Sequence, residues 1–310
     1  MIELFLAASF TAATPLILTT IGGAFAEKSR TTNISMEGMM LISAFFAVVV
    51  SFLTGNAWFG LLGGVGAATL SALLFSFVVF KLGCHLIIGG IGFNLFAAGL
   101  NLLLMNVWFN EPGAFSPRPR ITLPRVDIGN LSNIPIIGPA LNNQSILFFV
   151  AIVLIILAHL VMEKTKYGYW VRAVGENIDA ADAAGIPSTK IRISTLIISG
   201  FTAGIGGAFL SISAFGAYSH NMTSARGFVA LAATIFGNGK IIPSVSAAFI
   251  FGIAEAATIR LQVGVVPTQV MMMLPYAATI LALLVYGLRK KLRGEKENLE
   301  SYVPSVMPKD

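Results

Sequence analysis

Long apolar runs separated by short polar stretches make up most of this chain. Each bilayer crossing by a helix needs about 20 mainly apolar residues. The pattern therefore predicts an all-α polytopic membrane protein of about nine segments, two of them too short to be simple spans. The runs fall at about 3–25, 38–54, 60–80, 86–108, 143–162, 190–212, 227–237, 244–260 and 268–288.

The composition agrees with a membrane location. Of the 310 residues, 56% are hydrophobic and 11% are charged, whereas a soluble domain has about a quarter charged residues. Repeat arrays, disordered tails and secreted disulfide scaffolds are excluded, and the single cysteine, Cys84, is expected to pack in the usual way. Residues 1–25 lack a positive n-region, so we expect them to remain as a membrane span.

The basic residues predict the orientation of the chain. Nine crossings place the two termini on opposite sides, and the five basic residues between 289 and 296 favour a cytoplasmic C-terminus. In this orientation 15 of the 20 Lys and Arg residues lie inside and 5 outside. The net charge of +6 is spread between the spans, so a nucleic-acid partner is not expected.

An internal repeat divides the chain. The pentapeptide Ile-Gly-Gly-Ala-Phe occurs at 21–25 and at 205–209, each time before a polar stretch and a new apolar run. Four runs precede the 109–144 loop, a fifth stands alone and four follow, so this single connecting span predicts two halves of inverted topology. The predicted units are a first membrane repeat (1–108), an extracytoplasmic loop (109–144), a connecting span (145–162), a cytoplasmic coupling loop (163–190), a second membrane repeat (191–288) and a cytoplasmic tail (289–310).

Two broken segments are expected to line a pathway through the membrane. The run 227–237 gives only about 16 Å of helix, so it is predicted to be discontinuous or re-entrant, and such backbone lines cavities or is buried in protein. Residues 31–40 and 219–230 are the predicted lining segments, although polar residues there can also satisfy broken helix ends. The candidate substrate-pathway residues are Asn33, Ser35, Glu37, Asn94, Asn101, Thr223, Arg226 and Glu255.

Glu255 is the most unusual of these residues because it interrupts an apolar run. Ionisable groups inside a membrane are costly and need a partner or a water path. Two alternatives stay open for Glu255: a contact with substrate or a proton, or an interhelical hydrogen bond to Ser, Thr or Asn. Asn94 and Asn101 are seven residues apart and share one helical face.

Neither a metal site nor an ATP site is predicted from the sequence. No histidine pair has metal-ligand spacing. A phosphate loop ending at Gly239-Lys240 would need glycine at 234 and Ser or Thr at 241, and the chain has Thr234 and Ile241. Energy for transport would then come from outside this chain.

A short helix is predicted over 178–184 in the loop 163–190. Asn177 is a good N-cap, Asp179 suits the positive end of the helix dipole, and Gly185 with Pro187 is a stop signal. A helix of two turns is marginal in isolation, so it is expected to dock against a partner or its own protein.

The loop 163–190 and two further motifs resemble those of the permease subunits of bacterial ABC importers. Residues 33–40 read Asn-Ile-Ser-Met-Glu-Gly-Met-Met, and residues 224–238 begin Ser-Ala-Arg-Gly-Phe-Val-Ala-Leu. The chain is similar to the family that serves branched-chain amino acids, ribose and other simple sugars, and nucleosides, and within it to the nucleoside and simple-sugar branch.

The resemblance implies a multi-pass protein of the bacterial inner membrane that transports a small neutral polar solute inward. Within this class of solutes, nucleosides are the expected substrates. The resemblance also implies an ABC ATPase subunit that binds ATP and Mg, a second permease (identical or paralogous), an extracytoplasmic substrate-binding protein, and no cofactor on this chain. The residues it places at the ATPase contact, together with the helix cap, are Gly175, Glu176, Asn177, Ala181, Ala184 and Gly185.

Other function classes remain as alternatives. A permease for simple sugars or branched-chain amino acids would share these motifs. A proton-coupled secondary transporter would use Glu255 and Glu37 as relay carboxylates. A channel or a membrane enzyme is disfavoured, because neither a ring-forming motif nor a nucleophile–base pair is evident.

Overall fold

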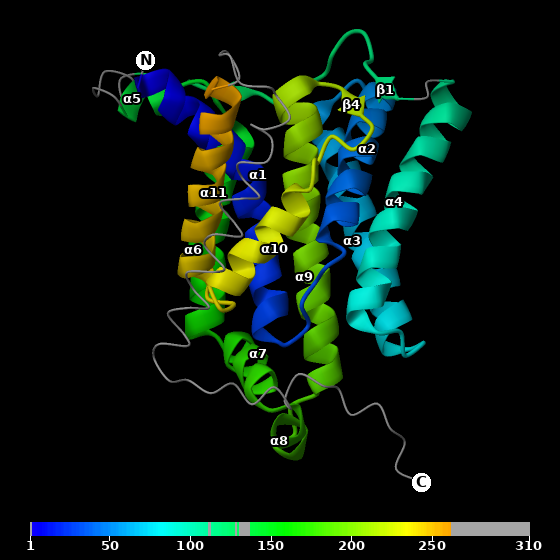
Figure 1. Cartoon of the computed structure of the whole chain (residues 1–310), viewed down its shortest axis with the longest axis vertical. Helices are drawn as coiled ribbons and strands as arrows, with labels where there is room; N and C mark the ends of the chain where they lie inside the picture. The colour runs from blue at the N-terminus through cyan, green and yellow to red at the C-terminus, as the bar shows by residue number, and fades with distance from the viewer. Residues whose placement is uncertain (1, 111–112, 128, 130–136, 262–310) are drawn as a thin grey trace.

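Seven helices in the described part of the chain are long and apolar enough to cross a membrane. The computed structural model describes residues 2–110, 113–127, 129 and 137–261 (Figure 1). The all-α membrane fold is confirmed, and the predicted run 268–288 and the tail lie outside the described residues. The long helices are α1 (Ile2–Lys28), α2 (Met36–Thr54), α3 (Ala57–Phe80), α4 (Leu86–Phe109), α6 (Ile146–Lys164), α9 (Ser188–Ala208), which continues as the π-helix η2 (Phe209–Phe215), and α11 (Ile241–Leu261).

Shorter elements connect these helices. The predicted short segment forms α10, which is 11 residues long. The strands pair as two small antiparallel ribbons, β1 with β4 and β2 with β3. The short elements are α5 (Ile137–Leu141), α7 (Lys166–Glu176), α8 (Ile178–Ala183), α10 (Arg226–Phe236), β1 (Ala114–Phe115), β2 (Arg125–Val126), β3 (Gln144–Ser145) and β4 (Tyr218–Ser219).

The helices follow two similar paths in opposite directions. Figure 1 shows α1 running toward the end of the molecule that carries α8, and α9 running away from it. After α1, residues 29–35 return part of the way before α2 begins; after η2, residues 216–225 return part of the way before α10 begins. This is the inverted arrangement of broken helices that the repeat predicts.

The repeated pentapeptide lies where α1 and α9 pack together. A Cβ atom on Gly22 would lie 2.6 Å from the Cα of Ser199, and one on Gly206 would lie 2.9 Å from the carbonyl oxygen of Pro15. Small residues at such crossings let membrane helices approach backbone to backbone. Glycine in both copies therefore has a packing reason, and the two repeats meet through it.

Part of the loop between α4 and α6 lies over the second broken segment. Ala114 and Phe115 pair with Ser219 and Tyr218, and the amide of Leu123 donates to the carbonyl of Ile212. No motif in this loop predicted the pairing. The loop thus covers the point where η2 gives way to the extended segment 216–225.

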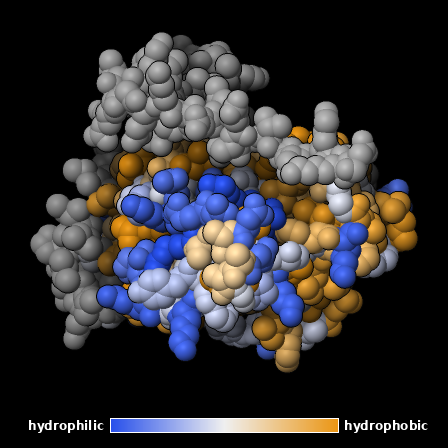
Figure 2. Space-filling view, turned by 90° about the horizontal axis from the view of Figure 1, so that it is seen from below, coloured by the Kyte–Doolittle hydropathy of each residue, from blue (hydrophilic) through white to orange (hydrophobic). Residues whose placement is uncertain are grey.

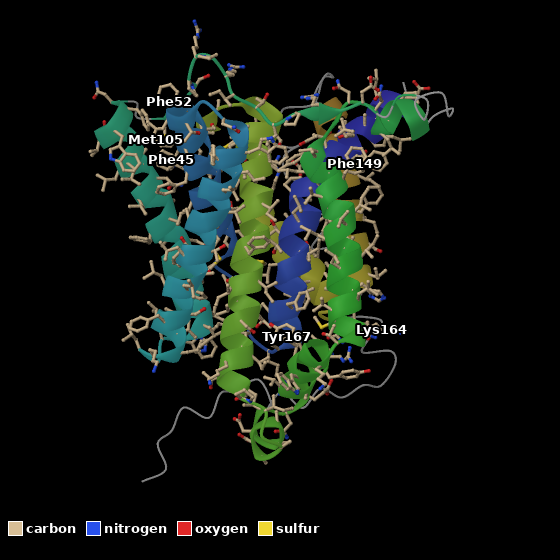
Figure 3. The ribbon with its side chains drawn as sticks, turned by 180° about the vertical axis from the view of Figure 1, so that it is seen from behind. Phe45, Phe52, Met105, Phe149, Lys164 and Tyr167 are labelled. Carbon is tan, nitrogen blue, oxygen red and sulfur yellow. The ribbon has the colours of Figure 1, made fainter. Side chains whose placement is uncertain are left out.

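The helix surfaces differ in how much protein covers them. In the most apolar window of α4 only 17% of residues are buried, against 78% in α2. Phe45 on α2 and Met105 on α4, both labelled in Figure 3, are fully buried. Large apolar side chains on the outer faces of α3, α4 and α6 are exposed, as lipid-facing residues are. α2 is therefore the most enclosed of the seven long helices that the structure describes.

Candidate functional site

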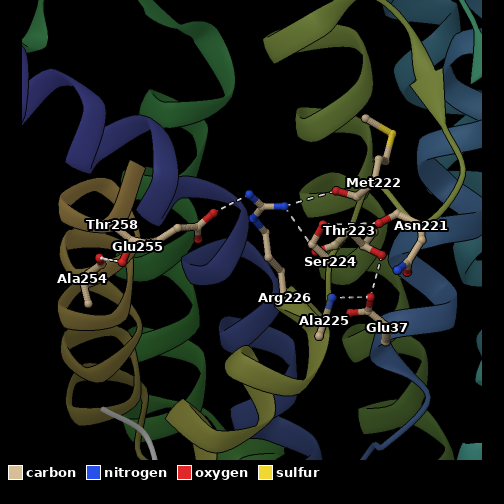
Figure 4. Close-up of polar contacts among 10 residues, drawn as sticks. All are labelled: Glu37, Asn221, Met222, Thr223, Ser224, Ala225, Arg226, Ala254, Glu255 and Thr258. Carbon is tan, nitrogen blue, oxygen red and sulfur yellow. Dashed lines mark hydrogen bonds and ion pairs between the residues drawn. The ribbon is translucent and has the colours of Figure 1, made fainter. Parts of the chain in front are cut away.

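The carboxylate of Glu37 joins the two broken segments. Glu37 lies in the first turn of α2, and its carboxylate reaches the N-terminus of α10 (Figure 4). Its Oε1 accepts hydrogen bonds from the Thr223 hydroxyl (2.6 Å) and the Ala225 amide (2.9 Å). Its Oε2 accepts one from the Gly227 amide at 2.6 Å. Hydrogen bonds to an ionised acceptor are the strong kind, and the helix dipole of α10 adds to them.

The local backbone around α10 makes this contact possible. Ser224 and Ala225 have positive φ values of 48° and 63°, which turn the chain sharply and aim successive amides at Glu37. A Cβ on Gly227 would lie 2.5 Å from the Glu37 backbone nitrogen. Only glycine allows the helix start to come so close. The glycine at 227 is thus explained by the geometry of the contact.

Asparagines on α4 form hydrogen bonds to the backbone of residues 34–41, at and just before the start of α2. Asn94 accepts from the Gly38 amide (2.8 Å) and donates to the Ile34 carbonyl (2.9 Å). Asn101 donates to the Leu41 carbonyl (2.9 Å) and to the Tyr218 hydroxyl (3.1 Å). The predicted shared face exists and is turned toward protein. Both residues hold the broken helix in place; a contact with solute stays a prediction.

The first broken segment supplies its own polar partners as well. Asn33 and Ser35 are buried. The Asn33 Oδ1 accepts from the Ser35 amide (3.0 Å) and hydroxyl (2.6 Å), while its Nδ2 donates to the Ser199 hydroxyl at 2.9 Å. The bond from the Ser35 amide satisfies a backbone donor that precedes α2, and the other two join buried side chains. Their role in lining a pathway is likewise still a prediction.

Glu255 forms an ion pair with Arg226. The Arg226 Nη2 donates to the Glu255 carboxylate, and its Nη1 donates to the carbonyls of Met222 (3.2 Å) and Thr223 (3.3 Å) (Figure 4). About a fifth of each charged side chain remains exposed, 21% for Arg226 and 18% for Glu255. The alternative of an interhelical hydrogen bond expected Ser, Thr or Asn as the partner of Glu255, whereas the partner in the structure is an arginine.

A cavity of about 530 Å³ opens beside this ion pair, and its lining combines apolar and polar side chains. Its volume is typical of a small-molecule site. Among the eight predicted pathway residues, Arg226 lines it. Sequence reasoning missed the others, because the loop and the broken segment meet only in three dimensions. The lining includes Ala114, Ser116, Arg120, Tyr218, Ser224 and Arg226.

The predicted short helix of the 163–190 loop is present as α8. The Asn177 Oδ1 accepts from the Ala180 amide at 3.0 Å, which confirms the N-cap, and Gly185 ends the motif with φ of +80°. Figure 2 looks onto this end of the molecule and shows a small apolar patch ringed by hydrophilic side chains. The exposed residues of this region include Asn177, Asp179, Ala180, Ala183, Ala184 and Gly185.

Three residues predicted at an ATPase contact are engaged within the chain. Ala181 is only 3% exposed and packs against its own chain, so its role at an ATPase contact stays a prediction. A Cβ on Gly175 would lie 1.9 Å from the carbonyl oxygen of Lys28, so this glycine allows α7 to pack closely against the end of α1. Glu176 forms an ion pair with Lys28 at 3.8 Å. Sequence spacing could not show which side of a two-turn helix faces its own protein.

Comparisons with known proteins agree with this architecture. Residues 5–283 match the family model described as branched-chain amino acid transport system, permease component. The chain is 34% identical to the nucleoside ABC transporter permease protein NupC of Lactococcus lactis, covering 88% of this chain and 89% of that protein. It is 32% identical to the guanosine ABC transporter permease protein NupQ of Bacillus subtilis, with 87% and 88% covered.

A more distant relative has a different solute in its name. The chain is 29% identical to the putative glucose ABC transporter permease protein TsgC13 of Haloferax volcanii, with 82% of this chain and 77% of that protein covered. No solved structure gave a significant match.

Proposed function

Since the chain belongs to the family of branched-chain amino acid transport system permease components, we propose that it passes neutral nucleosides inward as the permease subunit of an ABC importer. The chain is a transport component of such a system and not an enzyme, and it works with ATPase and substrate-binding partners. It is a multi-pass protein of the inner membrane. The nucleoside assignment rests on the two relatives that cover most of the chain.

One structural observation favours a neutral solute. Helix N-termini at broken transporter helices commonly bind an anionic group of the substrate. Here the N-terminus of α10 is occupied by the chain's own Glu37, and Arg226 is paired with Glu255. This helix end and this arginine thus already have charged partners within the protein. A free carboxylate, as in a branched-chain amino acid, would find no unpaired helix end there.

Further parts of the proposal concern orientation and assembly. The helix ends near α8 carry Lys28, Lys81 and Lys164, while the opposite end carries arginines of the 113–127 loop. This distribution supports a cytoplasmic α8 end, with the N-terminus outside and the C-terminus inside. In the proposal the chain pairs with a second permease, and ATP and Mg bind the partner ATPase.

Uptake measurements test the solute. In cells that carry the complete set of subunits, radiolabelled uridine and adenosine are expected to enter, ribose weakly, and leucine not at all. Depleting ATP should stop uptake, and an uncoupler that leaves ATP intact should not. Entry of leucine alone, or uptake that responds to the uncoupler and ignores ATP, would overturn the proposal in favour of an amino-acid permease or a proton-coupled transporter.

The α8 surface gives a second test, of ATPase docking. Ala184→Arg adds a large charge to an exposed position and is expected to prevent co-purification of the ATPase without changing the thermal stability of the permease. Ala181→Arg forces a charge into a buried position and is expected to destabilise the chain by several kcal/mol.

Ala184→Ser is the matched control and should bind the ATPase normally. The assignment of the docking face would be wrong if Ala184→Arg bound normally, or if Ala181→Arg left the melting temperature unchanged.

A further inference from the structure

A row of polar contacts joins α9 to the first broken segment. The Arg192 Nε donates to the Thr31 hydroxyl (3.1 Å), the hydroxyls of Thr195 and Ser29 lie 2.8 Å apart, and the Asn33 amide donates to the Ser199 hydroxyl (2.9 Å). We call this row the α9 seam. On α9 its members follow a spacing of three and four residues, which puts them on one face of the helix.

Apart from Arg192, which is partly exposed, the residues of the α9 seam are buried. Thr195, Ser199, Ser29 and Thr31 are 0% exposed, and Asn33 is 1% exposed. Buried polar groups that keep their partners favour one relative position of the elements they join. Thr195 and Ser29 can also donate to the carbonyls of Arg192 and Ala26, so the seam acts through the set of contacts as a whole. The segment 29–35 is therefore expected to move with α9 and not against it.

The α8 end of α9 is tied to the docking helix. Asp182, which belongs to α8, accepts from the Ser188 amide (3.0 Å) through Oδ1 and from the Ser188 hydroxyl (2.8 Å) through Oδ2. On the neighbouring helix α7, the hydroxyl of Tyr167 lies 2.6 Å from that of Ser194, at the α8 end of the bundle (Figure 3). Burial raises the pKa of Tyr167 above its ordinary value, so at neutral pH the phenol stays protonated.

The other end of the α9 seam leads to the Glu37 contact. Asn33 accepts from Ser35, which directly precedes α2, and Glu37 in the first turn of α2 holds the start of α10. At its far end α9 continues through η2 into the second broken segment. The helix α9 is thus hydrogen-bonded to α8 at one end and to the segment 29–35 along its side. At its other end it is continuous in the chain with the segment 216–225.

From these contacts we propose that α9 is the element that transmits movement of α8 to both broken segments, with Thr195 and Ser199 as its positioning residues. The inference rests on the proposed function, because it assumes that a partner ATPase moves α8. Thr195 and Ser199 need touch no solute in this role. Their role is to couple ATP hydrolysis to solute transport.

The test measures ATP hydrolysed per solute transported by the complete transporter in proteoliposomes. Thr195→Val combined with Ser199→Ala removes two hydroxyls of the α9 seam. This ratio is expected to rise about tenfold, the factor that corresponds to one or two lost buried hydrogen bonds. The matched control is Thr258→Val with Ser76→Ala, two buried hydroxyls that donate to carbonyls of their own helices. The control should leave the ratio unchanged.

A cross-link provides the second measurement and does not depend on the first variant assembling. Ser29→Cys with Thr195→Cys, on a Cys84→Ser background, replaces hydroxyls that lie 2.8 Å apart with thiols able to form a disulfide. The reduced protein is expected to be uncoupled, and oxidation should restore the wild-type ratio, because a covalent bond replaces the hydrogen bond.

The outcomes separate the two proposals. If the wild-type complex transports no nucleoside, the proposed function fails. If it transports nucleosides and the ratio of the Thr195→Val, Ser199→Ala variant stays at the wild-type value, the α9 seam is structural only. If the oxidised cross-link stops transport, the segment 29–35 must slide along α9 during the cycle, and the transmission proposal is overturned.

Discussion

Glu37→Gln is expected to reduce transport roughly a hundredfold while the chain still reaches the membrane. The glutamine has nearly the same shape, but one oxygen becomes an NH2 group that faces a backbone N–H. In the wild-type chain three donors bond to this carboxylate. Losing the charged acceptor leaves a buried donor unpaired, which costs about 3 kcal/mol, or roughly a hundredfold in an equilibrium constant. The contact between the repeats would weaken accordingly.

Two measurements check this expectation. The melting temperature of the purified permease should fall by roughly 6 to 12 °C, and nucleoside uptake should drop in vesicles that contain the complete transporter. Glu3→Gln is the matched control, because Glu3 is an exposed acidic residue in the first turn of α1, and it should behave as wild type. Normal uptake by Glu37→Gln would show that the carboxylate does not hold the two halves together.

The helices themselves could be predicted from the sequence, whereas the polar partners could not. A run such as 60–80 predicts its helix because burial in lipid requires an unbroken apolar stretch, and α3 is indeed Ala57–Phe80. The Asn177 cap was predictable for the same reason: cap and helix are neighbours in sequence. Local chemistry determines both.

Long-range contacts explain what the sequence left open. Glu37 and Thr223 are 186 residues apart, and nothing in either motif indicates that a carboxylate in one half caps a helix in the other. Likewise, the side of α8 that faces its own chain depends on the elements packed around it, so the burial of Ala181 could not be predicted from spacing. The polar residues were found because charges and amides are rare in the spans, but their partners required the fold.

Breaking the ion pair between Arg226 and Glu255 is expected to have the second largest effect. Glu255→Gln and Arg226→Gln should each lower the melting temperature by about 5 °C, because an unpaired charge or a lost pair in a mostly buried site costs about 2 kcal/mol. Each should also reduce uptake at least tenfold. Glu163→Gln, which removes an exposed partner of Arg172, is the control and should change neither quantity.

The charge exchange separates stability from transport. Arg226→Glu with Glu255→Arg restores an ion pair, so the melting temperature should return to within about 2 °C of wild type. Uptake should stay low, because a carboxylate at 226 cannot donate to the carbonyls of Met222 and Thr223, and the wall of the cavity loses its guanidinium. Full recovery of uptake would instead show that the pair serves stability alone. Arg226 therefore has a place in the pathway only if its own hydrogen bonds, and not merely its charge partner, prove necessary.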